Sequence, residues 1–354
     1  CISVSINKNT LLVGTSNGTL VWYKRIQQKF EQEGQIELHS QIRNISVFNN
    51  HIFVLTKSCL YEIDLLHKSE RIIFESNDSH KSLYVESENS FYIGTRTPMI
   101  HIKQRTPEYT IFSKAVNRIL GIVKCNDSLL YLGTEAGLIL LNNGHLQDTI
   151  LNDKINMIHK ISSNMIACAT ESQGIYIIEN DRIICEYKPT NIKDFICNAI
   201  QYDTLNNQIY VGSSEGLYQF KFDQKKLVFL QKLGQDIGLF YNQIQSISYN
   251  ESTIFLATHS GVFFLEKNIN AENFKTYTLF LKSFKANGNQ MDLTTSSALQ
   301  MGTNHIEIES QAVSFTSHKD ISYVYYLAGG NTDSLISHEG KITYTNLKPG
   351  SYNL

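Results

Sequence analysis

The clearest pattern of apolar and polar positions in this chain is a short motif that recurs seven times. An apolar pair is followed by a third, mostly small residue, then by Thr or Ser, and in most copies by Gly a few residues later. The third positions of the seven copies are Gly14, Leu55, Gly94, Gly133, Ala169, Gly212 and Ala257. Successive copies are therefore 41, 39, 39, 36, 43 and 45 residues apart. A strand repeat of this length is typical of the blades of a β-propeller.

Each repeat contains further strand signals around the motif. A first strand such as 244–249 precedes a polar turn, the motif strand follows, and a third strand such as 217–220 comes after a Gly turn. A more variable and polar fourth strand completes the unit. The outer strands alternate apolar and polar residues but the motif strand does not, which predicts an inner strand buried on both faces. Its small residue suits a place where neighbouring blades approach closely.

Two copies of the repeat depart from the pattern. The second has Leu55 at the small position and Cys59 in place of the turn Gly, and in the third Thr97 and Pro98 replace that Gly. We expect altered hairpins at these places and no missing blade.

The repeat stops after about residue 278, and a different β pattern follows. Apolar segments at 306–308, 313–315, 323–327 and 342–345 predict several short strands. The expected fold is all-β, with a seven-bladed β-propeller over residues 1–278. A small immunoglobulin-like β-sandwich over residues 279–354 follows it, with its last strand incomplete at Leu354.

Composition and charge narrow the function. The chain has 31 basic and 33 acidic residues, a formal net charge of −2, and neither a basic run nor a stripe, so nucleic-acid binding has little support. A local charged patch can still be present in such a balanced total. The six cysteines lack metal-type spacing. No nucleotide, metalloprotease or serine-nucleophile motif is present, and turn solvation explains the recurring Glu135, Glu171 and Glu215. We therefore expect no catalytic site, metal or cofactor.

The repeats resemble the two-component-regulator propeller repeat, in which an Asn-x-Val/Ile opening precedes an aromatic-Ile-Gly-Thr-x-x-Gly-Leu core. Four units match the opening at 117–119, 156–158, 198–200 and 242–244, and Asn44 with Ile45 is a shifted version. The segments 323–329 and 344–352 resemble the triple-tyrosine domain that follows such propellers. The tryptophan usual between these two tyrosine segments is absent, since Trp22 lies in the first repeat.

This resemblance implies the periplasmic sensor region of an inner-membrane histidine kinase or hybrid two-component regulator, tethered through the full-length protein. Many such sensors detect glycan fragments, so the expected partner is an oligosaccharide or another small ligand. The resemblance also implies a homodimer through the C-terminal domain and a transmembrane helix beyond Leu354. Phosphotransfer would lie outside this segment.

The candidate ligand-binding residues are those that open the first strand of each repeat, because rotation about the ring axis places equivalent positions on one face. They are Arg43, Asn44, Asn117, Arg118, Asn156, Asn198, Tyr241 and Asn242. Amide and guanidinium groups bind hydroxyls and carboxylates, and tyrosine offers an apolar face. A repeated asparagine also caps turns through its own backbone, and this is the favoured interpretation of the asparagines. Arg43, Arg118 and Tyr241 break the repeat and are the sharper candidates.

Two other functions stay open at this point. One is a propeller scaffold that binds another protein, for which an apolar patch of several hundred Å² would be evidence. The other is a propeller lyase or glycosidase, which turnover of a glycan would reveal.

Overall fold

The chain divides into two compact units in the computed structural model. The first comprises Cys1–Gly234 and Leu239–Ile269, and the second Gln235–Gly238 and Asn270–Leu354. The structure describes residues 3–7, 9–27, 29–96, 98–104, 106–111, 118–189, 192, 195–234, 237–239, 243–270, 278–291, 305–313, 323–327, 334–345, 347 and 350–351. Over these ranges the regular elements are β-strands without α-helix, and no helix long and apolar enough to cross a bilayer occurs among them.

The described strands of the first unit form seven antiparallel sheets, each from strands consecutive in sequence. The first four sheets comprise β1 (Ser3–Asn7), β2 (Thr10–Gly14), β3 (Thr19–Ile26), β4 (Lys29–Glu37); β5 (Ile42–Phe48), β6 (His51–Thr56), β7 (Cys59–Asp64), β8 (Ser69–Glu75); β9 (Ser82–Ser87), β10 (Ser90–Gly94), β11 (Pro98–Lys103), β12 (Thr106–Ile111); β13 (Ile119–Lys124), β14 (Leu129–Thr134), β15 (Leu138–Asn142), β16 (His145–Leu151). The other three comprise β17 (Ile155–Lys160), β18 (Met165–Thr170), β19 (Ile175–Glu179), β20 (Arg182–Tyr187); β21 (Cys197–Asp203), β22 (Gln208–Ser213), β23 (Gly216–Asp223), β24 (Lys226–Leu233); β25 (Ile244–Tyr249), β26 (Thr253–Thr258), β27 (Gly261–Glu266).

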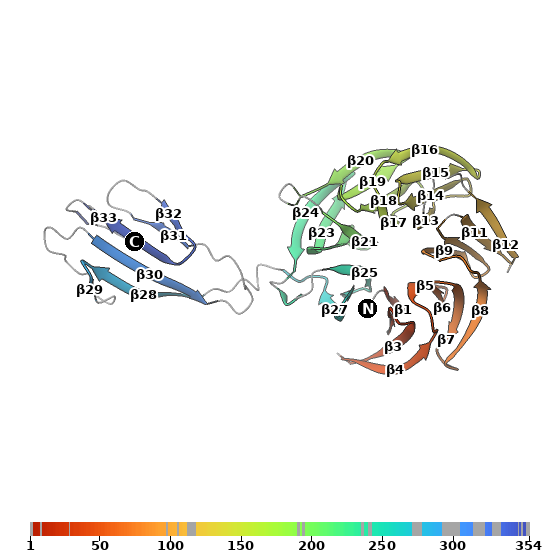
Figure 1. Ribbon diagram of the computed structural model, residues 1–354, viewed down its shortest axis with the longest axis horizontal. Helices are drawn as coiled ribbons and strands as arrows, with labels where there is room; N and C mark the ends of the chain where they lie inside the picture. The colour runs from red at the N-terminus through yellow and green to blue at the C-terminus, as the bar shows by residue number, and fades with distance from the viewer. Residues whose placement is uncertain are drawn as a thin grey trace. The chain divides into compact units, whose positions relative to one another are not determined.

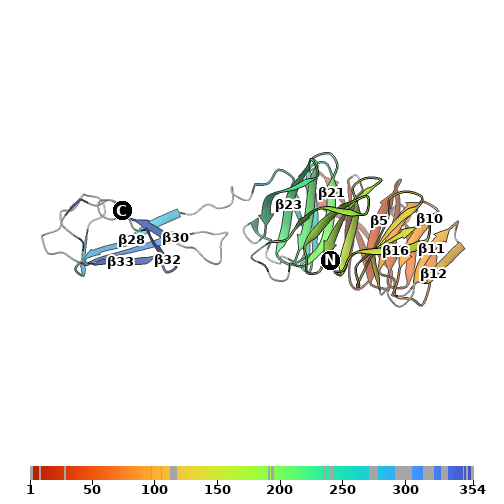
Figure 2. The ribbon, with the colours of Figure 1, turned by 90° about the horizontal axis from the view of Figure 1, so that it is seen from above.

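These sheets follow one another around a ring. The first strand of each sheet contacts the first strand of the next, and β25 contacts β1, which closes the ring (Figure 1). Figure 2, turned by 90°, shows the neighbouring sheets standing side by side. The first strands are therefore innermost, whereas the motif strands β2, β6, β10, β14, β18, β22 and β26 are second in each sheet. Sheets 2 and 3 are four-stranded despite their altered turns, with Cys59 and Pro98 opening their third strands.

Burial and turn chemistry explain the motif. The motif strands are buried almost throughout, and β10 is buried at every position. Each motif hydroxyl donates a hydrogen bond of 2.8–3.2 Å to a carbonyl across the following turn, from Thr15, Thr56, Thr95, Thr134, Thr170, Ser213 and Thr258. In sheets 1, 3, 4 and 5 the backbone amide of the same threonine also donates to that carbonyl, so the hydroxyl reinforces a turn that the backbone already closes.

The small residue of the motif makes room for a large residue of the next sheet. A Cβ atom on Gly14 would lie 2.7 Å from Ile42 Cγ2, and one on Gly212 would lie 2.6 Å from Ile244 Cγ2. The same isoleucine contact occurs at Gly94 with Ile119 and at Gly133 with Ile155. Each of these isoleucines opens the first strand of the following sheet. The glycines are therefore required by packing between sheets, because interiors tolerate little overlap.

The exceptions to the glycine follow the same volume rule. Ala169 shares a core cluster with Cys197, the smaller residue that opens β21. The sheet after that of Leu55 begins its first strand with Ser82 instead of isoleucine. Leu55 packs with Phe91 and Ile93 of that next sheet. A larger motif residue therefore accompanies a smaller residue at the next strand start.

The second unit is a separate β structure with its own small core. One sheet has the order β29 (Asn289–Gln290), β28 (Thr278–Ala286), β30 (His305–Val313), β33 (Lys341–Thr345), and a second pairs β31 (Tyr323–Tyr326) with β32 (Ser334–Ser337). Ile308, Tyr325, Ile342 and Tyr344 form the core, so side chains of both sheets meet. The Tyr325 hydroxyl donates to Gly340 O at 2.7 Å, and the amide of Ala312 donates to the Tyr323 hydroxyl at 2.9 Å. These two tyrosines of the triple-tyrosine resemblance thus fix neighbouring strands, whereas Tyr352 lies outside the described residues.

Candidate ligand-binding face

The starts of the first strands lie on one face of the ring, because each pairs with the end of its antiparallel motif strand. Ile42 pairs with Thr56, and Ile155 with Thr170. This strand-start face therefore carries the first-strand openings together with the turns that follow the motif strands.

In five sheets a β-bulge follows the first residue of the first strand. The residues left out of the pairing are Arg43, Leu120, Asn156, Asn198 and Gln245. A bulge breaks the regular alternation and re-aims the side chain of the extra residue. Each of these five sheets thus has one irregular side chain on this face, and its residue type differs between sheets.

Two of the predicted asparagines connect neighbouring sheets. Asn156 Nδ2 donates to Cys197 O at 3.0 Å, and Asn198 Nδ2 donates to Ile244 O at 3.1 Å. Ser82 Oγ makes the corresponding link to Ile119 O at 2.9 Å. Each acceptor is the carbonyl of the residue that opens the next first strand. These side chains therefore stabilise the ring, through the adjacent sheet and not through the local turn that the sequence suggested.

The other predicted residues do not form one ring of equivalent positions. Asn44 follows the bulge and pairs with Leu55, one place later than Asn156 in its sheet. Arg118 precedes its strand in the left-handed backbone region, with φ 41°. Asn117, Tyr241 and Asn242 lie outside the described residues. The described asparagines thus occupy two registers.

The turn carboxylates noted in the sequence are held by cations. Arg118 pairs with Glu135 and Lys154 with Glu171, each at 2.8 Å, and Lys232 lies 3.5 Å from Glu215. Each of the three carboxylates is thus neutralised locally and fixes a turn to a neighbouring strand.

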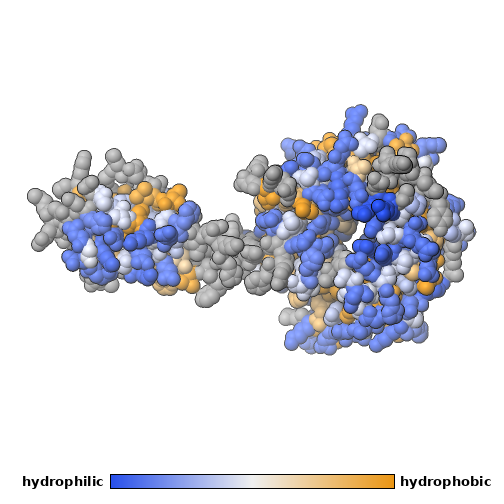
Figure 3. Space-filling view, in the orientation of Figure 1, coloured by the Kyte–Doolittle hydropathy of each residue, from blue (hydrophilic) through white to orange (hydrophobic). Residues whose placement is uncertain are grey.

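Five basic side chains gather where sheets 2, 3 and 4 begin. We refer to Arg43, Lys57, Lys81, Arg96 and Arg118 as the cation cluster. Backbone hydrogen bonds join their segments in turn: the amide of Lys57 donates to Gln41 O, that of His80 to Lys57 O, that of Lys81 to Gly94 O and that of Arg118 to Arg96 O. Figure 3 shows strongly hydrophilic side chains beside the ring opening, on the side where β9 and β13 lie in Figure 1. Sequence analysis missed Lys57, Lys81 and Arg96.

The charges of this cluster act on one another. Burial lowers the pKa of Lys81, and the nearby charges of Arg43, Arg118 and Lys57 lower it further, with Glu135 opposing them. Burial also lowers the pKa of Arg43, whose Nε is buried without a hydrogen-bond partner. Like charges held this close repel one another unless a counter-ion joins them.

His80 lies between Lys57 and Lys81 in this network and adds no charge at neutral pH. Its side chain is fully buried, its ring stacks on Phe74, and its Nε2 lies 2.9 Å from Ser76 Oγ. Burial lowers its pKa to about 4.

We expect the first unit to lose stability as pH falls from about 6.5 to 4, since the unfolded chain binds the His80 proton first. At about 1.4 kcal/mol per pKa unit, the His80 part of this loss approaches ~3 kcal/mol at pH 4, and His159, whose pKa burial also lowers to about 4, adds a part of its own. Urea unfolding monitored by fluorescence of Trp22, the single tryptophan of the chain, measures it. The variant His80→Gln should lack this component of the pH dependence. Equal slopes in both proteins would contradict the assignment.

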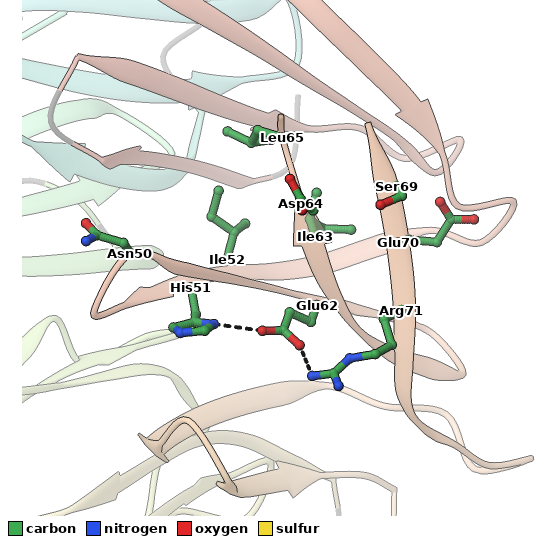
Figure 4. Close-up of a pocket in the computed structure, with 10 residues that line it drawn as sticks. All are labelled: Asn50, His51, Ile52, Glu62, Ile63, Asp64, Leu65, Ser69, Glu70 and Arg71. Atoms are coloured by element: carbon green, nitrogen blue, oxygen red, sulfur yellow. Dashed lines mark hydrogen bonds and ion pairs between the residues drawn. The ribbon is translucent and has the colours of Figure 1, made fainter. Parts of the chain in front are cut away.

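Two hollows lie away from this face, and in each of them some of the lining side chains contact one another. The larger, of about 630 Å³, lies on sheet 2, where Glu62 accepts from His51 at 2.7 Å and pairs with Arg71 (Figure 4). Burial would raise the pKa of Glu62, but these two partners outweigh it and the pKa is lowered. The smaller, of about 210 Å³, lies between sheets 3 and 4, where His101 stacks on Tyr92 at 4.0 Å. No cluster of metal-binding side chains occurs in the described part of the chain.

Comparison with solved structures identifies the fold. The chain matches the extracellular domain of BT4673 from B. thetaiotaomicron, described as a hybrid two-component system, with TM-score 0.60 and 13% identity over 99% of this chain and 53% of that one. A second structure of that domain, described as part of a one-component system, matches equally. The WD40 β-propeller domain of Doa1 matches with TM-score 0.63 and 9% identity over 75% of this chain and 93% of that domain.

The fold is that of a β-propeller protein. The chain spans about half the length of the BT4673 structure. No family model matches the sequence, and no curated protein matches it.

Proposed function

We propose that this chain is the extracytoplasmic, ligand-sensing region of a membrane-bound two-component regulator. The observation that carries the proposal is the match to the BT4673 extracellular domain, which extends over 99% of the chain and so includes both units. The seven sheets are then the blades of one propeller, the second unit is the triple-tyrosine-type, immunoglobulin-like sandwich, and the region lies on the periplasmic side of the inner membrane.

The proposed ligand is an oligosaccharide. The strand-start face supports a polar ligand, because most of the described side chains that mark it are charged or amide-bearing, and a large apolar patch is not formed by them. Neither the pairing of the turn carboxylates with cations nor the sheet-bridging asparagines suggests bond cleavage. The chain itself is proposed to be non-catalytic, with a histidine kinase in the full-length protein.

Signal transmission is assigned to the second unit, through a change between two copies and onward to a transmembrane helix. The outer face of β31 and β32 supports a contact with a second copy, because Val324, Tyr326 and Ile336 are 47%, 66% and 68% exposed there. Such signalling requires that the ligand bind two arrangements with different affinity.

Calorimetric titration of the purified chain against a panel of neutral and acidic oligosaccharides tests the sensing role. We expect saturable binding of at least one class. If no member binds, and the full extracytoplasmic region is equally silent, the chain is not a saccharide sensor. Binding of a protein partner through an apolar surface would then favour the scaffold function, and turnover of a glycan would favour an enzyme.

A further inference from the structure

The cation cluster is a local excess of positive charge in a chain without one overall. The formal net charge of the chain is −2, yet five cations meet at the starts of three successive sheets. Glu135 lies among them and pairs with Arg118, and Asp78 lies near His80. Arg43, Lys57, Lys81 and Arg96 form no ion pair with any described carboxylate.

The corresponding cation of sheet 5 is compensated. Lys154, which precedes the first strand of sheet 5 as Arg118 precedes that of sheet 4, pairs with Glu171. Among the residues that the structure describes, the unpaired cations therefore gather at sheets 2–4, whereas the cation that precedes sheet 5 is paired. Because like charges oppose folding, an uncompensated group of this size indicates a place for an external anion.

The side chains of the cluster are carried by rigid segments. Thr56 and Thr95 close the turns that hold Lys57 and Arg96, and Ser82 ties the strand after Lys81 to Ile119. Arg43 occupies a bulge, where the side chain departs from the regular alternation, and its buried Nε has a hydrogen-bond capacity that the described residues leave unused. Guanidinium groups bind carboxylate and sulfate oxygens through paired N–H donors, and ammonium groups act as point charges beside them.

We propose that the strand-start face of sheets 2–4 binds an acidic oligosaccharide through the cation cluster, with carboxylate or sulfate groups of the sugar bound by Arg43, Lys81 and Arg118. This inference rests on the proposed sensing function and defines the chemical class of its ligand. Lys57 and Arg96, both exposed, lie at the rim and attract the anion over a longer range.

The test is calorimetric titration of the chain at low and moderate salt with three probes: a tetra-galacturonate, a sulfated disaccharide and a neutral tetrasaccharide. We expect one or both acidic probes to bind, at least tenfold more weakly at the higher salt, and the neutral probe not to bind. The carboxylated and sulfated probes distinguish the two anionic groups. The substitutions Arg43→Gln and Lys81→Gln should each weaken binding by about 10- to 100-fold, the range for a charge-assisted hydrogen bond.

Lys154→Gln is the matched control, because it removes a paired cation from the same face. It should change affinity less than twofold. Lys81→Gln should also raise the unfolding temperature of the free protein, since it relieves repulsion, whereas loss of a purely structural lysine would lower it.

The outcomes separate the two proposals. Binding of the neutral probe that Arg43→Gln and Lys81→Gln leave unchanged would overturn the acidic-ligand inference and keep saccharide sensing. Equal weakening by Lys154→Gln and Lys81→Gln would also overturn it, because the site would not be localised. Binding of an acidic peptide, with no saccharide bound, would overturn the saccharide-sensing function and the acidic-saccharide inference with it.

Discussion

Replacing Lys267 with methionine is expected to lower the free energy of unfolding of the first unit by about 3–5 kcal/mol, the cost of breaking a buried ion pair from one side. Lys267 pairs with Asp203, and the side chains are 8% and 0% exposed. Asp203 also accepts from Asn206 Nδ2 at 2.8 Å, and Lys267 lies 4.4 Å from the Tyr249 ring centroid. Asp203 ends β21, and Lys267 follows β27, so the pair joins sheets 6 and 7. Without the lysine, a carboxylate stays buried without its counter-charge.

The pH dependence of this variant has a definite sign. Burial would raise the pKa of Asp203, but Lys267 and the hydrogen bonds outweigh it and lower that pKa in the folded protein. The pair therefore stabilises the fold above about pH 4, the pKa of a free Asp, and this contribution is lost as pH falls through the lower folded value. In Lys267→Met the carboxyl lacks its main partner and protonates at higher pH, so the deficit should shrink as pH falls.

Urea unfolding at pH 7 and at pH 4.5, monitored by Trp22 fluorescence, measures both effects. The double variant Asp203→Asn with Lys267→Met is the control. It should recover much of the loss, because it removes the buried charge as well as its partner. A single variant within about 0.5 kcal/mol of the wild type, the usual range for surface changes, would show that the pair is not buried in solution.

The second prediction concerns the contact between Gly212 and Ile244. Gly212→Ala should destabilise the first unit by about 1–3 kcal/mol, the usual cost of overpacking, because the new Cβ would meet Ile244 Cγ2 at 2.6 Å. Ile244→Cys alone should also destabilise, since it leaves a cavity beside Gly212. In the core between sheets 5 and 6 the chain itself has alanine at the motif position, Ala169, together with a small strand-start residue, Cys197.

The double variant Gly212→Ala with Ile244→Cys copies that pair. We expect it to be more stable than the sum of the two single changes implies, with a coupling energy of at least ~1 kcal/mol, as for residues in direct contact. Unfolding of all four proteins in urea forms the double-mutant cycle. Strict additivity would mean that the strand-start residue does not determine the size of the motif residue.

The sequence predicts the β-propeller architecture because the motif carries its information locally. An apolar pair, a small residue and a hydroxyl that closes a turn lie within a few positions, and each repeat provides an independent copy. The sequence alone does not show which residue of the neighbouring sheet the small residue makes room for. The partner of Gly14 is Ile42, which belongs to the next sheet, so the volume match becomes visible only when the sheets are placed side by side.

The candidate site was less accessible to sequence analysis. Successive members of the cation cluster are 14 to 24 residues apart in the sequence, so they do not form a basic run. The nearly equal numbers of basic and acidic residues allow a local patch but do not locate it. Arg43 and Arg118 were predicted because they depart from the repeat at the strand openings. Lys57, Lys81 and Arg96 do not depart from it in this way. The asparagines are a different case. The sequence shows Asn44 as a shifted version of the opening, and the structure gives the reason: Asn44 follows the bulge of its strand, whereas Asn156 is the extra residue of its own bulge.

The closure of the ring has a mechanical consequence. Each sheet is built from consecutive strands, and the first and last sheets meet through side chains of Val4, Leu11, Phe255 and Ala257, with no strand shared between them among the described residues. Many apolar contacts, and not a backbone ladder, therefore hold this seam. Circular permutants that join the two ends of the ring and cut between other sheets should keep the same fold. A pulling force applied across residues 3 and 269 should separate sheets 1 and 7 before any sheet unravels, because peeling side-chain contacts apart one after another requires less force than shearing a hydrogen-bonded ladder.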